Sequence, residues 1–161
     1  MAKAGSLVAR AVATGFGCGH VPRAPGTAGS ALALVLAWLA VEKLNWQPWH
    51  AALAGIGMIP LGVWASGRVA RETRSSDPQV VVIDEVLGQW VALAGAFASH
   101  WLVWLGALAL FRAFDIWKPP PARQAERLAG GLGIVMDDIV AGAYAALVLF
   151  LTGCFNRYWV W

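Results

Sequence analysis

The chain is poor in charged residues: only 13% of its 161 residues are Asp, Glu, Lys or Arg, while 59% are hydrophobic. Soluble domains average about 25% charged and about 45–50% apolar residues. A soluble domain of this size has no room to hide so much apolar surface from water. The shortage of charge therefore predicts a protein embedded in lipid, and the length fits a single domain over residues 1–161.

Two further shortages exclude other classes of protein. The only cysteines, Cys18 and Cys154, lie near opposite ends of the chain, which argues against a disulfide framework or a cysteine-rich metal site. The net charge is only +3, and the basic residues are scattered over the ends of apolar segments rather than gathered in a stripe. We therefore expect no nucleic-acid partner.

Long apolar stretches alternate with polar connectors, and they predict an all-α fold, a polytopic bundle of membrane-crossing helices. The third stretch is long enough to form either one helix or a hairpin that turns near Ser99–His100. We expect the hairpin, with helices over 84–98 and 101–117, and therefore about five crossings; a single helix would give four. The stretches cover residues 27–41, 49–66, 86–111 and 139–155.

The basic residues favour the hairpin, because cytoplasmic connectors of membrane proteins are enriched in Lys and Arg. A hairpin places two basic connectors on the same side of the membrane, with the N-terminus inside and the C-terminus outside. The sequence thus predicts a multi-pass protein of the inner (cytoplasmic) membrane. The two connectors hold Arg68, Arg71 and Arg74, and Arg112, Lys118, Arg123 and Arg127.

Five of the nine acidic residues lie next to or within apolar sequence: the pairs Asp84–Glu85 and Asp137–Asp138, and the single Asp115. Carboxylates at the edge of a membrane helix are costly unless they are paired or bound to metal. Oxygen-only ligands in pairs suit Mg²⁺. In the hairpin topology all five lie at cytoplasmic helix ends, so we expect one Mg²⁺ site that faces the cytoplasm. The alternative role of each pair is to cap the helix that it opens.

Basic and hydroxyl side chains near these acids point to a phosphate ligand. Arg112, Asp115 and Lys118 are spaced by three and share one helical face, where Arg and Lys would hold a phosphate. The Gly- and Pro-rich segment before the first apolar stretch leads to Thr27, which we expect to cap a helix whose free N–H groups bind an anion. Glu126 lies in a polar connector, and we expect it to lie away from the acid pairs.

No serine, cysteine or histidine nucleophile motif accompanies these residues. What remains is metal-assisted hydrolysis of a phosphate ester, with a free carboxylate as the general base. An Asp nucleophile is the alternative.

Four sequence blocks, in this order, resemble the phosphatidylglycerophosphatase A family: TGFGCGHVPRAPGTAGS, DPQVVVIDEVLG, FRAFDIWKPPP and GGLGIVMDDIVAG. The resemblance implies a phospholipid substrate in the bilayer and Mg²⁺-dependent hydrolysis of phosphatidylglycerophosphate to phosphatidylglycerol and inorganic phosphate. It also implies roles for individual residues. These are catalysis by Asp84, Asp138 and Asp115, metal binding by Asp84, Glu85, Asp137 and Asp138, and phosphate binding by Arg112, Lys118, Thr27 and Ser30.

Two other functions compete with this interpretation. A cation transporter would also use membrane carboxylates, but it should hold them near the midplane on broken helices and without neighbouring Arg and Lys. A lipid phosphotransferase would need an Asp-Gly…Ala-Arg…Asp motif, which the chain lacks. The sequence does not determine the oligomeric state.

Overall fold

A computed structural model describes the backbone of residues 2–159 and the side chains of residues 5–154. The described part of the chain is helical and contains no strand, so the predicted all-α fold is confirmed. Its elements are α1 (Ala2–Ala13), the 3₁₀ turn η1 (Cys18–His20), α2 (Pro25–Leu44), α3 (Pro48–Thr73), α4 (Ile83–Ala92), the 3₁₀ turn η2 (Leu93–Gly95), α5 (Trp101–Trp117), α6 (Ala122–Ala125) and α7 (Gly131–Trp159).

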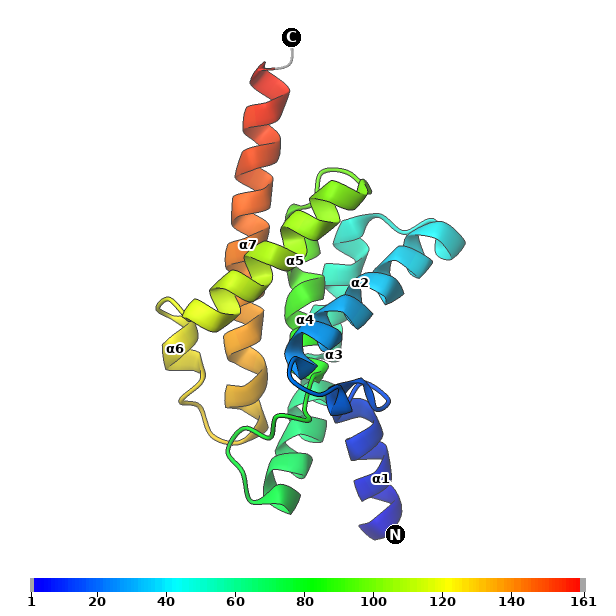
Figure 1. Cartoon of the computed structure of the whole chain (residues 1–161), viewed down its shortest axis with the longest axis vertical. Coiled ribbons are helices and arrows are strands. Elements are labelled where there is room, and N and C mark those ends of the chain that lie inside the picture. Colours follow the sequence, from blue (N-terminus) through cyan, green and yellow to red (C-terminus); the bar gives the residue numbers. More distant parts are fainter. Residues whose placement is uncertain (1, 160–161) are drawn as a thin grey trace.

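Five of these helices run in alternating directions, with one end of each at a common cavity. The cavity is lined by the N-terminal ends of α2 and α4, the first turns of α7, and the C-terminal ends of α3 and α5. In Figure 1, α7 follows the long axis of the molecule, whereas α2 and α5 are inclined to it. The short helix α4 packs against α2, α3 and α7 and so forms the centre of the bundle.

Within the described residues, three helices are long and apolar enough to cross a membrane: α2, α3, and α7 over residues 131–154. Many of their large apolar side chains face outward, as lipid contact requires, among them Trp38, Leu53 and Phe150. A crossing needs about 20 residues, and α4 and α5 have only 10 and 17. The helical membrane bundle is therefore confirmed, while the predicted number of five crossings is approximate.

The break predicted within the third apolar stretch is present, between α4 and α5. Helix α5 begins at Trp101, and His100 caps it by accepting a hydrogen bond from the backbone N–H of Leu102 (3.3 Å). Helix α4 ends at Ala92 and η2 at Gly95, which is earlier than the predicted end at Ala98. At Gly95 the backbone lies directly against the carbonyl of Ala146 in α7, leaving no room for a side chain.

Small residues let α4 and α7 approach closely. A Cβ on Gly88 would lie 2.6 Å from the carbonyl oxygen of Asp138, and Gly142 lies against the carbonyl of Gly88. Ala92 and Ala141 are fully buried in the same region. Because lipid offers no hydrophobic force between helices, such close backbone packing is a main source of their association.

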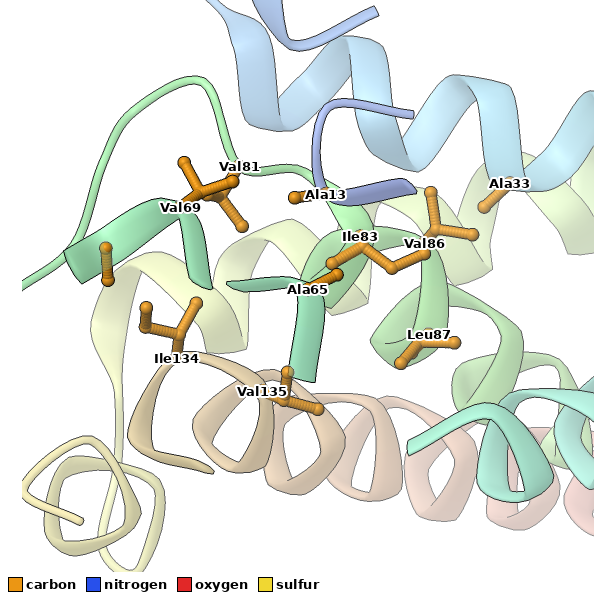
Figure 2. Close-up of a cluster of buried hydrophobic side chains, with 11 residues drawn as sticks. Ala13, Ala33, Ala65, Val69, Val81, Ile83, Val86, Leu87, Ile134 and Val135 are labelled. Atoms are coloured by element: carbon orange, nitrogen blue, oxygen red, sulfur yellow. The ribbon is translucent and has the colours of Figure 1, made fainter. Parts of the chain in front are cut away.

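An aliphatic cluster joins α3, α4 and α7 near their cavity ends. Figure 2 shows Ala65 of α3, Leu87 of α4 and Val135 of α7 within this cluster. Its member Ile83 immediately precedes the first acidic pair, and Val135 lies two residues before the second. The packing thus fixes the helix segments that carry the acids.

Candidate active site

The two acidic pairs, which are far apart in the sequence, meet at the α4–α7 contact. One carboxylate oxygen each from Asp84, Glu85 and Asp138 lies within 4.8 Å of the other two. Asp84 and Asp138 are buried, with exposed fractions of 8% and 4%. Gly88 lies one turn after Asp84 and allows the α7 backbone at Asp138 to come this close. The carboxylates are therefore held together by close packing of the α4 and α7 backbones.

Several oxygens of this cluster have no hydrogen-bond donor among the described residues. They are Asp84 Oδ1, Glu85 Oε2, Asp137 Oδ1 and Asp138 Oδ2, and all four are buried. A buried polar atom without a partner costs free energy, and a carboxylate costs more than a neutral group. Converging carboxylate oxygens are the ligands that hard divalent cations prefer. The residues present therefore fit a Mg²⁺ ion.

Two cations from the end of α5 border the acids. Arg112 Nη1 lies 2.6 Å from Asp115 Oδ2 and 3.8 Å from Glu85 Oε1. Lys118 Nζ donates a hydrogen bond to Asp137 Oδ2 (2.7 Å) and lies 3.0 Å from Glu126 Oε1. Burial opposes the charge on Lys118, but the interactions with Asp137 and Glu126 outweigh burial and raise its pKa. Both cations thus border the carboxylate cluster, and Lys118 is held in its charged form.

The expected position of Glu126 is wrong. This residue is not remote from the acid pairs, because it forms an ion pair with Lys118, which also pairs with Asp137. It also lines the cavity. The short connector from Lys118 through α6 folds back onto α7, which α6 contacts. This fold-back, which periodicity does not reveal, brings Glu126 to the site.

The alternative capping role fits only one acidic pair. Asp84 and Glu85 lie in the first turn of α4, where the helix dipole favours negative charge. Helix α7, however, begins at Gly131 and has no acid in its first turn, so Asp137 and Asp138 lie in its second turn. We expected this helix to start at the second pair. It starts earlier because the apolar run 131–136 continues it, with Gly131 packed tightly against α3.

The two hydroxyl residues of α2 lie in different places. Thr27 does not cap the helix: α2 begins at Pro25 after Ala24, since Pro with its fixed φ favours the first helical position. Thr27 is nevertheless exposed and lines the cavity. Ser30 is fully buried, donates a hydrogen bond to the carbonyl of Gly26 (2.9 Å), and does not line the cavity. Gly26 itself lies against the Glu85 carboxylate, and a Cβ added at Gly26 would lie 2.8 Å from Arg112 Nη1.

The cavity that contains these groups has a volume of about 920 Å³. Its wall includes polar residues that the sequence patterns did not single out for a binding role. Arg23 belongs to the loop before α2, and Arg71, which we used only to predict topology, belongs to α3. His20 and the connector 75–81 complete this part of the wall. Connectors show no helical periodicity, so their spacing alone carries no signal for a shared site.

Comparison with known proteins adds independent information. A family profile described as "Phosphatidylglycerophosphatase A" matches residues 11–152. The chain is 36% identical over 143 residues to the phosphatidylglycerophosphatase A of Escherichia coli, covering 88% of this chain and 81% of the relative. It is 34% identical over 150 residues to the phosphatidylglycerophosphatase A of Haemophilus influenzae, covering 92% and 88%.

A third relative is named for a different activity. A Bacteroides thetaiotaomicron protein named "Putative phosphatidylinositol-3-phosphatase" is 38% identical over 144 residues, covering 86% of this chain and 89% of the relative. No solved structure gives a significant match to the chain.

Proposed function

This chain belongs to the phosphatidylglycerophosphatase A family and is a phosphoric monoester hydrolase; on this premise we propose that it removes the terminal phosphate of phosphatidylglycerophosphate. The products would be phosphatidylglycerol and inorganic phosphate. The observation that carries the proposal is the buried cluster of Asp84, Glu85 and Asp138 with Arg112 and Lys118 at its border. Such a set can bind a cation and a phosphate side by side.

Asp84, Glu85 and Asp138 are the residues that would hold Mg²⁺, with Asp137 at the edge of the same cluster. When bound, the ion would withdraw charge from the phosphoryl group and help to position the attacking water. The support for this assignment is the set of buried carboxylate oxygens that have no donor among the described side chains.

Arg112 and Lys118 would bind the oxygens of the terminal phosphate. Asp115 holds the Arg112 guanidinium at one edge, while Arg112 Nε has no partner among the described residues and can donate to a ligand. Asp115 is in this proposal a positioning residue that acts through Arg112. Thr27 lies on the same cavity wall and offers a hydroxyl.

The chemical step is the attack of water on phosphorus. One proton of the water passes to a carboxylate of the cluster, for which Asp138 Oδ2 and Asp137 Oδ1 have no competing donor among the described residues. The bond from phosphorus to the glycerol oxygen breaks, and that oxygen takes up the proton that the carboxylate received from the water. Phosphatidylglycerol and inorganic phosphate then leave. An Asp nucleophile is the alternative path to the same products.

The membrane setting follows from the lipid substrate. The acyl chains would stay in the bilayer while the head group enters the cavity at the helix ends. The basic residues at this end of the bundle, among them Arg71, Arg74 and Arg123, support a cytoplasmic orientation at the inner membrane. A cation-transport role finds no support, since the acids lie at helix ends beside two cations.

Phosphate release by the purified protein in detergent micelles tests the proposal. We expect turnover of phosphatidylglycerophosphate in the presence of Mg²⁺. Phosphatidylinositol 3-phosphate is the matched competitor, because the Bacteroides relative carries that name. A clear preference for the inositol lipid, or no release of phosphate from either lipid, would overturn the proposed substrate.

A further inference from the structure

The cavity is lined by two pairs of strongly basic side chains that differ in their partners. Arg112 and Lys118 are each paired with carboxylates at 3.0 Å or less. Arg23 and Arg71 line the same cavity and are exposed. Neither has a carboxylate within 4.0 Å among the residues that the structure describes, although Asp77 also lines the wall. The second pair is therefore free to bind an anion from outside the protein.

These two arginines stand on different walls of the cavity. Arg23 lies in the loop that leads into α2, shortly before Gly26, whose backbone contacts Arg112 and Glu85. Its backbone is left-handed (φ 71°), an uncommon conformation for a residue with a side chain. Arg71 lies on α3 near Gly67, and its Nη1 would be 3.5 Å from a Cβ added at Gly67. Gly67 itself packs against Gly131 at the start of α7. The loop before α2 and the α3–α7 contact thus each supply one guanidinium.

The proposed substrate has two phosphates, and the first pair of cations accounts for only one of them. Its terminal phosphate is a monoester, and its inner phosphate is a diester that joins the head-group glycerol to diacylglycerol. The cavity volume of about 920 Å³ is ample for a head group of this size. Guanidinium groups suit phosphate oxygens because their N–H donors form a planar fork.

We propose that Arg23 and Arg71 form a second anion site that binds the inner phosphodiester of the lipid while Arg112 and Lys118 hold the terminal phosphate. This inference rests on the proposed function. It makes the two exposed arginines determinants of substrate recognition that do not touch the reacting phosphorus. A contact of this kind is the same in the bound substrate and in the transition state, so its loss raises KM and leaves kcat nearly unchanged.

The experiment compares Arg23→Gln and Arg71→Gln with Arg123→Gln in detergent micelles. Arg123 is exposed, has no ion pair among the described residues and lies outside the cavity, yet belongs to a basic connector at the same end of the bundle. It therefore matches the change in charge without the proposed contact. We expect KM for phosphatidylglycerophosphate to rise about tenfold for each cavity variant, because a tenfold change corresponds to the loss of one modest charge-assisted hydrogen bond. The control should change KM less than about twofold, as expected for a surface charge screened by salt.

Two inhibitors separate the subsites in the same assay. Short-chain phosphatidylglycerol has the diester but no monoester, and inorganic phosphate resembles only the monoester end. We expect the cavity variants to lose inhibition by phosphatidylglycerol and to keep that by inorganic phosphate. An unchanged KM, an equal rise for Arg123→Gln, or equal weakening of both inhibitors would overturn the second site. Failure of the wild-type protein to hydrolyse the lipid would instead overturn the proposed function from which the inference starts.

Discussion

Replacing Asp138 by asparagine separates a role that needs charge from one that needs only shape, because the two side chains are nearly isosteric. Asp138 is 4% exposed and lies in the second turn of α7, too far from the helix start to cap it. One of its oxygens lies within 4.8 Å of oxygens of Asp84 and Glu85. Removing one such electrostatic group should lower phosphate release at least about 10²-fold, while the protein still folds and inserts.

The same substitution should lower activity but should not lower the stability of the metal-free protein. Two unit charges 4.8 Å apart repel by roughly 3 kcal/mol at an effective dielectric constant of about 20. Asp138 faces two such neighbours, Asp84 and Glu85, so its neutralisation relieves repulsion of this order for each of them that is ionised. Without metal, we expect Asp138→Asn to unfold at or above the wild-type temperature. The rise in unfolding temperature on adding Mg²⁺ should be smaller than in the wild type, because a ligand has been lost.

Phosphate release and thermal unfolding in detergent, each with and without Mg²⁺, measure both effects. Glu42→Gln is the control, since Glu42 is exposed at the far end of α2 and outside the cavity. It should leave both the rate and the response to Mg²⁺ close to wild type. Near-normal turnover of Asp138→Asn, or a wild-type response of its stability to Mg²⁺, would refute the assignment of this residue to a metal-dependent site.

Three further predictions concern the metal, the topology and the helix packing. Excess chelator should abolish phosphate release and added Mg²⁺ should restore it, and full activity in chelator would contradict the metal site. Reporters fused after Thr73 and after Arg123 should both read cytoplasmic and one near Gln47 external; disagreement between the first two would rule out the predicted hairpin. Gly142→Ala should destabilise the fold by about 1–3 kcal/mol in thermal unfolding, because its backbone lies against a carbonyl of α4. Gly57→Ala, where nothing lies within 4 Å, should be neutral or slightly stabilising, and equal losses at both glycines would contradict this packing argument.

The acid pairs could be found from the sequence because of the cost of charge in lipid. A carboxylate within an apolar run stands out whatever the tertiary structure, and Asp84 and Asp138 do meet in space. The break before Trp101 follows a short polar sequence that no membrane helix favours.

The remaining features of the site could not be predicted from the sequence, because they depend on how the connectors fold and on where each helix begins. The start of α7 lies in apolar, glycine-containing sequence that has no capping signal, so the position of Asp137 within its helix was misjudged. The hydroxyl of Ser30 bonds within its own helix, which its residue type alone does not reveal. Glu126 reaches Lys118 only because the connector through α6 folds back onto α7. Arg23 and Arg71 share a cavity through tertiary packing alone.

The charges of the cavity are the reason why we expect a phosphate to bind there only together with a metal ion. Seven acidic residues line the cavity, against four basic ones, namely Arg23, Arg71, Arg112 and Lys118. If all of these groups are ionised, the lining has a net charge of −3. A phosphate monoester carries a further charge of about −1.5 to −2 at neutral pH and would be repelled by such a surface. A divalent cation among Asp84, Glu85 and Asp138 would reduce the net charge from −3 to −1 and so weaken this repulsion, which is why we expect substrate binding to depend on the metal.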